Sequence, residues 1–490
     1  MSSLSSSPTV TSAVSRFPWL HPALIVVGAL VAFAMHFRPW EGAFLEEWPL
    51  AELWMDRGGF AFAANYFEWS LSRPLHLVPT ALGLAITGGA PWGIFLVLGV
   101  VAAGQFLAVV WALRTLSRSF WISGAVALFI ALHPLWPGGF LQRFLPAQTA
   151  ALALILAAGL LIRWLQQGRV RWIVWTAVTL ALGMSCYPGP AVAAPLMAVV
   201  VALAVQASWP RRVIAVVVVT GASAVVTVYS LVIARLLVPG GATYEAGNFA
   251  AGSVGGARDI VAHVGTVLLG QGLLVVAGVL AIAALGGVLA LTGSIPHWAG
   301  WLMTGTAVVS PVCTVVFFGN LAWLQDIERV AYATSLGLGI ALLVWPMMSI
   351  GRRPRFEAVI AAVLVLFTLL GAVRGVQHWQ PYIALQHQLF AELAPVVHEA
   401  EGDEIVIVVD HSGTYGSEYT LPQYYVSSAS HIMNDDATRV WLCYLPEDPA
   451  LAGAAPCDPK DTGDEMRLVN SFSVPAGDVD IYIGVPGSDD

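Results

Sequence analysis

Charged residues are scarce in this sequence, and lysine is almost missing. Asp, Glu, Lys and Arg make up 11% of the 490 residues, and of the 22 basic residues one, Lys460, is a lysine. Hydrophobic residues make up 58%, and the mean hydropathy is +0.76. Apolar runs of about 20 residues can cross the roughly 30 Å hydrocarbon core of a bilayer. The composition excludes a soluble globular protein and predicts an α-helical polytopic membrane protein.

Other missing features exclude further classes. No basic run and no nucleic-acid motif is present, and the formal net charge is −8, so a nucleic-acid partner is not expected. No Cys/His spacing typical of a zinc site occurs. The apolar runs contain almost no charged residues, whereas transporters place such residues inside the membrane as ion or proton relays. The polar residues lie instead in the loops, which is typical of chemistry at the membrane surface.

The first apolar run, residues 20–37, follows a Ser/Thr-rich segment, residues 1–19, that we expect to be disordered and cytoplasmic. The run could be a signal peptide or a retained helix. His36-Phe37-Arg38-Pro39 stands at its end in place of a small-x-small cleavage site, which favours a retained first helix.

The predicted topology depends on four arginine clusters, which are Arg114/Arg118, Arg163/Arg169/Arg171, Arg211/Arg212 and Arg352/Arg353/Arg355. They fall on one side of the membrane, the cytoplasmic side, if residues 74–89 do not span it. Pro74, Pro79, Gly83, Gly88 and Gly89 favour an interfacial or re-entrant helix in this segment. The first external loop then extends over residues 38–91, and a second long external loop covers residues 238–271.

The sequence therefore predicts about eleven transmembrane helices within residues 20–378, in the cell membrane, with a cytoplasmic N-terminus. The region 259–293 holds either one span or an interfacial helix followed by a span. The predicted spans are 20–37, 92–113, 119–135, 146–166, 171–187, 189–207, 212–237, 272–293, 298–318, 329–350 and 355–374.

The long apolar runs stop before residue 379, and the residue pattern of 379–490 predicts a small extracytoplasmic α/β domain. An amphipathic helix is expected over Tyr382–Ala400, followed by strands at 404–409, 438–444 and 478–485. Cys443 and Cys457 lie fourteen residues apart and could form a disulfide outside the cytoplasm; the alternative is two unpaired cysteines on the cytoplasmic side. Asp410-His411-Ser412 has the residue types of a hydrolase triad, but adjacent residues cannot adopt triad geometry, so a strand-end turn is expected.

Polar residues on the predicted outer side are the candidates for function. The first loop carries the adjacent carboxylates Glu46 and Glu47, and later Arg73 before Pro74. The positive-inside rule disfavours arginines on the outer side, so an arginine there suggests a specific role. The other candidates are His133, Arg143 and Arg329, and Tyr244, Glu245 and Arg258 in a Gly-rich loop that could act in gating.

The order of these motifs resembles that of GT-C membrane glycosyltransferases, which use polyprenyl-phosphate sugars. The resemblance rests on Glu46-Glu47 after the first helix, Arg73-Pro74-Leu75 before a short helix, Trp111-Ala112-Leu113-Arg114 at a span end, and Ala131-Leu132-His133-Pro134 followed by Arg143. It covers roughly residues 20–170 at motif level. The acidic position is usually Asp-Asp or Asp-Glu in that class, and here it is Glu-Glu.

The resemblance implies transfer of a sugar from a polyprenyl-phosphate donor to a glycan, lipid or protein acceptor of the cell envelope. A first-loop carboxylate would take the acceptor's proton, and matching the first acidic position favours Glu46 for this role. Arginines would bind the leaving phosphate, with Arg73, His133, Arg143 and Arg329 as the candidates. Glu46 and Glu47 with a third carboxylate could also hold Mg²⁺ or Mn²⁺, although no compact ligand spacing requires a metal.

Four of these residues also have a simpler structural explanation. Glu46 and Glu47 could form a solvated loop face, Arg73 could cap the interfacial helix or pair with Glu68, and His133 could simply end a helix. Two other function classes share the architecture. One is a transporter or flippase for lipid-linked sugars, which predicts polar or broken helices near the midplane. The other is a non-catalytic assembly protein on the same scaffold.

Overall fold

The structure is a computed structural model, and it describes most of the chain. The described residues are 20–65, 71–116, 119–237, 262, 265, 273–317, 339, 341–342, 354–402, 404–415, 420–421, 423–436, 438–444, 455–456 and 466–485.

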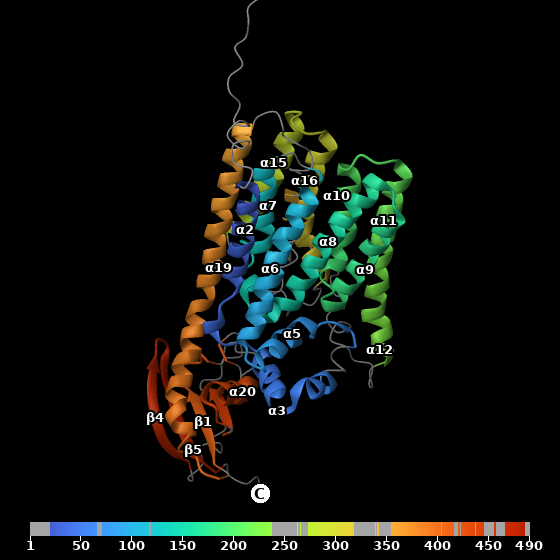
Figure 1. The fold of residues 1–490 in the computed structure, drawn as a ribbon. Coiled ribbons are helices and arrows are strands. Elements are labelled where there is room, and N and C mark those ends of the chain that lie inside the picture. Colours follow the sequence, from blue (N-terminus) through green and yellow to red (C-terminus); the bar gives the residue numbers. More distant parts are fainter. Residues whose placement is uncertain are drawn as a thin grey trace, which may run out of the picture.

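The main body is a bundle of apolar helices, with a small mixed sheet beyond one end (Figure 1). By length and composition, five helices of the described residues can each cross a bilayer, so the chain is a multi-pass membrane protein. The bundle helices are α2 (Leu20–His36), α6 (Trp92–Leu113), α7 (Phe120–Leu132), α8 (Leu145–Gln167), α9 (Val170–Cys186), α10 (Pro190–Ala204), α11 (Trp209–Val228), α15 (Leu273–Leu291) and α16 (His297–Phe317). A π-helical turn, η4 (Tyr229–Ile233), and α12 (Ala234–Leu237) extend α11.

These helices match the predicted spans closely, with two shorter than expected. The predicted span 189–207 forms α10 over Pro190–Ala204. The predicted span 119–135 ends at Leu132, because His133 adopts a left-handed conformation with φ 43° and precedes a proline. The predicted span 329–350 lies almost entirely outside the described residues. The total of eleven spans therefore stays a prediction.

Among the described residues of the predicted first loop, two segments form α-helices, of which one was expected. Helix α5 (Val78–Thr87) has 10 residues, about 15 Å at 1.5 Å per residue, which is too short to cross a bilayer. Helix α3 (Glu47–Asn65) was not predicted, and Gly58 with φ 74° kinks it. Both helices lie at the end of the bundle that faces the sheet (Figure 1). The length of α5 fits a segment that does not span the membrane, and the interfacial placement of residues 74–89 stays a prediction.

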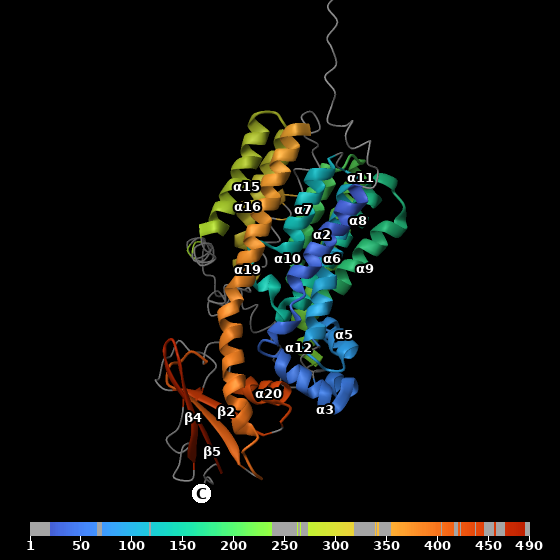
Figure 2. The same ribbon diagram turned by 60° about the vertical axis from the view of Figure 1, so that its left-hand side comes forward.

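Helix α19 (Pro354–Val397) runs without a break through the domain boundary expected near residue 379. The last predicted span and the predicted amphipathic helix are one continuous helix of 44 residues, about 66 Å long. Its first part runs along the bundle, and its last part lies against the sheet (Figure 2). Leu389, Phe390, Leu393 and Val397 of the predicted apolar stripe are buried in the core of the C-terminal domain.

The C-terminal sheet has five strands in the order β3-β2-β1-β5-β4. Strands β1 (Ile405–Asp410), β2 (Val440–Tyr444) and β5 (Gly477–Gly484) coincide with the three predicted runs, while β3 (Ala455–Pro456) and β4 (Arg467–Val474) were not predicted. Helix α20 (Gln423–Asn434) connects the parallel strands β1 and β2, and β5 pairs antiparallel with β1 and β4. A βαβ unit completed by a β-hairpin thus forms the small α/β domain.

The start of the first loop packs into this C-terminal domain. Ala43 and Trp48 belong to the same buried cluster as the sheet residues, and the Trp48 and Phe390 rings lie 5.6 Å apart between centroids. On the bundle side, Gln380 of α19 donates a hydrogen bond to Glu41 at 3.1 Å, and Trp379 donates one to the Pro137 carbonyl at 2.9 Å. Helix α19 therefore ties together the bundle, the first loop and the sheet.

Candidate functional site

Glu46 lies between a short 3-10 turn, η1 (Pro39–Glu41), and the start of α3. The residue before it, Leu45, is buried and has a left-handed backbone with φ 52°. A bulky residue seldom adopts this conformation, which costs roughly 1–3 kcal/mol and persists where the surrounding structure imposes it. The packing of the first loop thus fixes the direction in which the Glu46 side chain leaves the backbone.

Arg143 meets Glu46 across the end of the bundle. A guanidinium nitrogen of Arg143 lies 3.5 Å from a carboxylate oxygen of Glu46, and the side chains are 8% and 42% exposed respectively. Arg143 belongs to the turn η3 (Gln142–Phe144), immediately before α8. The neighbouring Gln142 amide donates hydrogen bonds of 3.1 Å to the carbonyls of Gly42 and Pro91, which anchors this turn to the first loop.

Glu47 has a different environment from Glu46, although the two are adjacent. Its side chain is 3% exposed, and its Oε2 has no hydrogen-bond partner among the described residues. Burial raises the pKa of Glu47 well above its ordinary value, and the Glu46 charge raises it further, against an opposing effect of Arg143. The pair therefore combines an accessible carboxylate with a buried carboxyl group that favours its neutral form.

His76 lies within electrostatic reach of Arg73, Glu46 and Arg143, which places Arg73 in the same region as the other two. Its Nδ1 lies 2.9 Å from the Cys186 carbonyl, and the Leu75 amide donates to the Ser185 carbonyl at 3.1 Å, so this segment packs on the C-terminal end of α9. Burial lowers the pKa of His76 to about 4, and the charge of Arg73 lowers it further. The charges of Glu46 and Arg143 also act on His76, with smaller effects of opposite sign.

Arg73 itself lies over the Tyr187 ring, with 5.3 Å from the guanidinium carbon to the ring centroid. Because the carbonyls at the end of α9 carry partial negative charge, a cation is favourable there. The sequence-predicted residues Glu46, Glu47, Arg73 and Arg143 thus gather at one end of the bundle. His76 was missed by the sequence interpretation, although it follows Arg73-Pro74-Leu75 directly.

A buried ion pair supports the first loop beneath these residues. Arg38 and Glu41 lie 2.6 Å apart with side chains 3% and 0% exposed, and Arg38 also donates to the Phe140 carbonyl. This pair joins the end of α2 to η2 (Pro137–Phe140) and, through Glu41, to Gln380 of α19. Arg38 was considered only at the end of the first apolar run, and its pairing with Glu41, three residues further on, was not predicted.

The structure places His133 in a separate buried group. Its Nε2 lies 2.9 Å from the Gln148 amide oxygen and 3.3 Å from that of Gln105, and the His133 side chain is 3% exposed. Gln105 also donates to the Gln148 amide oxygen at 2.7 Å. This network connects α6, α7 and α8 inside the bundle, and it is a group separate from the contact between Glu46 and Arg143.

Several predicted positions lie outside the described residues, namely Tyr244, Glu245, Arg258, Arg329 and Cys457. Cys443 is disulfide-bonded, and its pairing with Cys457 stays a prediction. Asp410 ends β1, and its carboxylate accepts hydrogen bonds from the Ser412 amide, the Ser412 hydroxyl and the Tyr415 amide. Asp410-His411-Ser412 is therefore the expected strand-end turn.

Neither Glu46 nor Glu47 belongs to a three-ligand metal cluster in the described part of the chain. The group of carboxylate and imidazole atoms that could hold an ion consists of Glu52, Asp56 and His431. It lies further along α3, at the contact with α20.

No protein-family model matches the chain, and no curated protein matches it. Among solved structures, the chain is similar to the crystal structure of ArnT from Cupriavidus metallidurans bound to undecaprenyl phosphate. The similarity covers 97% of this chain and 99% of that chain, at 13% sequence identity and a TM-score of 0.48. At this identity and TM-score, the likeness assigns no activity and no residue role to this chain.

Proposed function

We propose that this membrane protein is a glycosyltransferase of the GT-C type that transfers a sugar from a polyprenyl-phosphate donor to an acceptor of the cell envelope. The observation that carries the proposal is the contact between Glu46 and Arg143, 3.5 Å apart at the end of the helix bundle. A carboxylate and a cation thus lie side by side at the end of the bundle. A donor whose lipid tail stays in the membrane would present its phosphate and sugar at such an end.

The reaction needs a base and a stabilised leaving group. The acceptor hydroxyl oxygen attacks the anomeric carbon and forms the glycosidic bond, while the bond from that carbon to the phosphate oxygen breaks. The hydroxyl proton passes to the Glu46 carboxylate, and polyprenyl phosphate leaves with the electron pair. A positioned base contributes about 10²- to 10⁴-fold to the rate of such a step.

The leaving phosphate needs charge stabilisation more than it needs a proton. Arg143 can supply this through paired hydrogen bonds, because a guanidinium presents parallel donors that match phosphate oxygens. Its position just before α8 adds the favourable field of a helix N-terminus. Arg73, within electrostatic reach of the same region, is the second candidate for the phosphate.

Glu47 serves this site in a different way from Glu46. A general base must be ionised and reachable, and Glu47 is buried with a raised pKa. We assign Glu46 as the base and Glu47 as a positioning residue at the first turn of α3. The burial of Glu47 and the exposure of Glu46 support this assignment.

The polar network of Gln105, His133 and Gln148 inside the bundle favours a second candidate function, a flippase for lipid-linked sugars. Buried polar groups within membrane helices are typical of transport pathways. The two functions differ in their products. A flippase moves the lipid-linked sugar between leaflets and leaves its phosphate–sugar bond intact, whereas a transferase releases polyprenyl phosphate.

The test is incubation of the purified full-length protein in lipid with a radiolabelled polyprenyl-phosphate sugar and a cell-envelope extract as the acceptor. The proposal predicts release of polyprenyl phosphate together with transfer of label to the extract. Movement of intact donor between leaflets without cleavage supports the flippase. If neither cleavage nor movement occurs with donors that carry hexoses or pentoses, both functions are contradicted.

A further inference from the structure

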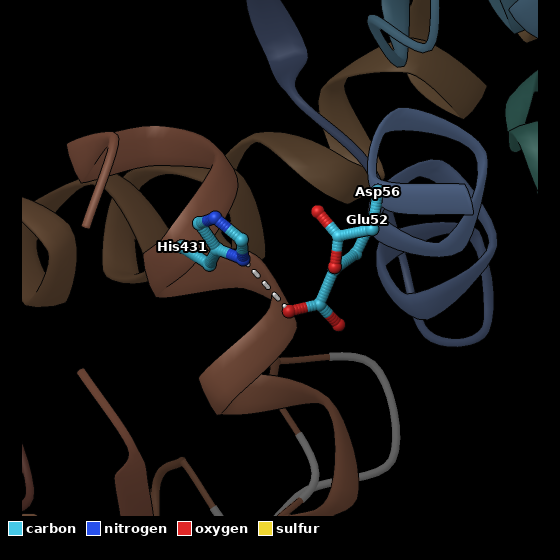
Figure 3. Close-up of side chains that lie close together, drawn as sticks. All are labelled: Glu52, Asp56 and His431. Carbon is cyan, nitrogen blue, oxygen red and sulfur yellow. Dashed lines mark hydrogen bonds and ion pairs between the residues drawn. The ribbon is translucent and has the colours of Figure 1, made fainter. Parts of the chain in front are cut away.

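We propose that Glu52, Asp56 and His431 form a binding site for one divalent transition-metal cation between the first loop and the C-terminal domain. Each residue offers one ligand atom, and these atoms lie within 4.8 Å of one another. Figure 3 shows the two carboxylates on α3 and the imidazole on α20 turned toward a common space.

The secondary structure explains why the three side chains converge. Glu52 and Asp56 are four residues apart on α3, so they share one face of the helix. His431 lies in the last turn of α20, and α20 packs against α3. The site thus joins two segments that are far apart in the sequence but adjacent in the fold.

The distances fit one ion after a small adjustment. Transition metals bind nitrogen and oxygen at about 2.0–2.2 Å, so two ligand atoms on one ion lie at most about 4.4 Å apart. The Glu52 carboxylate already lies 2.9 Å from the His431 Nδ1. All three ligand atoms lie within 4.8 Å of one another, so a side-chain adjustment of a few tenths of an ångström is enough to bring them onto one ion. Both Glu52 and His431 are about one-quarter exposed, which leaves a path for an ion from solvent.

Asp56 is the residue that distinguishes this group from a simple hydrogen-bonded pair. Its carboxylate is exposed, and within the described part of the chain it has no hydrogen-bond or ion-pair partner. Two like charges four residues apart on a helix repel each other, and a bound cation removes that cost. The cluster therefore has an uncompensated negative charge at the position where an ion would sit.

The donor set indicates which cations the site would bind. One imidazole and two carboxylates suit Zn²⁺, Mn²⁺ and related first-row metals, whereas Ca²⁺ and Mg²⁺ prefer oxygen ligands alone. The Ser428 hydroxyl donates to the second oxygen of Glu52 and holds that carboxylate in place. Such supporting contacts orient a ligand and raise metal affinity.

The same domain contains two matched controls. His398 pairs with Asp436, and His411 pairs with Asp480, each at the same 2.9 Å as Glu52 and His431. Neither pair has a third ligand atom nearby among the described residues. An imidazole–carboxylate contact alone is therefore common on this domain, and the third ligand separates the proposed site from the other two.

The test uses the full-length protein in detergent, with any affinity tag removed, titrated with zinc chloride and, separately, manganese chloride in a calorimeter. The proposal predicts one tight equivalent for wild type and an affinity at least about tenfold lower for both Asp56→Asn and His431→Gln. His398→Gln should bind as wild type does. Because Asp56 is exposed, its variant is expected to fold, and the thermal unfolding midpoint without metal checks this.

Two results would overturn the proposal. One is the absence of a tight equivalent for either metal in the wild type. The other is a loss of affinity in His398→Gln as large as that in Asp56→Asn, which would place the bound metal on scattered surface histidines.

Discussion

The Glu46 carboxylate lies 3.5 Å from the Arg143 guanidinium, although the two residues belong to segments separated by α3, α5, α6 and α7. The contact forms because two turns bring the side chains together. One contains Leu45 with its left-handed backbone, and the other contains Gln142, whose hydrogen bonds hold it to the first loop. The arginine thus has a carboxylate partner. A bound phosphate would compete for the same guanidinium, which would release Glu46 toward the acceptor.

The donor affinity should depend on Arg143. Arg143→Lys keeps the charge but loses the paired donors, so kcat/KM for the polyprenyl-phosphate sugar should fall about 10- to 100-fold, with most of the effect in KM. Arg163→Lys is the matched control, because Arg163 lies near the other end of α8. An unchanged KM in Arg143→Lys would remove this residue from the phosphate site.

Acid should destabilise the protein partly through His76. Its folded-state pKa of about 4 lies below the ordinary 6.5, so between these values the unfolded chain binds more protons than the folded chain. Stability contributed by neutral His76 is therefore fully present above about pH 6.5 and is lost as the pH falls toward 4, by at most about 1.4 kcal/mol per pH unit.

This pH dependence can be measured by comparing wild type with His76→Gln. Thermal unfolding midpoints between pH 7 and pH 4 should fall more steeply for wild type, because the amide does not titrate. The other buried histidines are present in both proteins and cancel in the difference. Parallel curves would contradict the placement of His76.

The contact between the first loop and the C-terminal domain should depend on Trp48. Its side chain is fully buried against Phe390, so Trp48→Ala should lower the free energy of unfolding by about 3–5 kcal/mol. Trp40→Ala, at a side chain that is 65% exposed, should have little effect. Similar midpoints for the two variants in thermal unfolding would show that the loop does not dock as the structure has it.

The predicted orientation can be tested with two exposed labelling positions. Thr115 follows α6 at the end of the bundle away from α5, and Met433 lies in α20, at the end shared with α3 and α5 (Figure 1). In intact cells an impermeant maleimide should label Met433→Cys and should reach Thr115→Cys only after the membrane is opened. Labelling of both positions from the same side would contradict the topology.

Much of the fold could be predicted because hydrophobic runs and arginine positions are local signals. Residues 92–113 were predicted as a span and form α6 with those bounds. The separation of α19 into two helices was wrong, because the composition changes near residue 379 while the backbone continues as one helix. Strand β4 was missed because its apolar and polar residues alternate only weakly. It is stabilised by its pairing with β5, which the local sequence does not reveal.

The candidate site was predictable as a set of residue types but not as an arrangement. Glu46, Arg73 and Arg143 could be selected from charge and predicted side of the membrane. The difference between Glu46 and Glu47 could not, because it arises when Glu47 alone becomes buried at the first turn of α3. His431 offered no signal, since its ligand partners Glu52 and Asp56 come from the other end of the chain.

The assignment of Glu46 as the base is tested most directly by sugar transfer with two isosteric variants. Glu46→Gln and Glu47→Gln, purified and assayed beside wild type with the polyprenyl-phosphate sugar, each remove one negative charge with little change in shape. Loss of the base should lower the transfer rate at least about 100-fold in Glu46→Gln. Glu47→Gln should keep most of the activity, because the glutamine resembles the neutral carboxyl that burial favours. Wild-type activity in Glu46→Gln, or a larger loss in Glu47→Gln, would contradict the assignment.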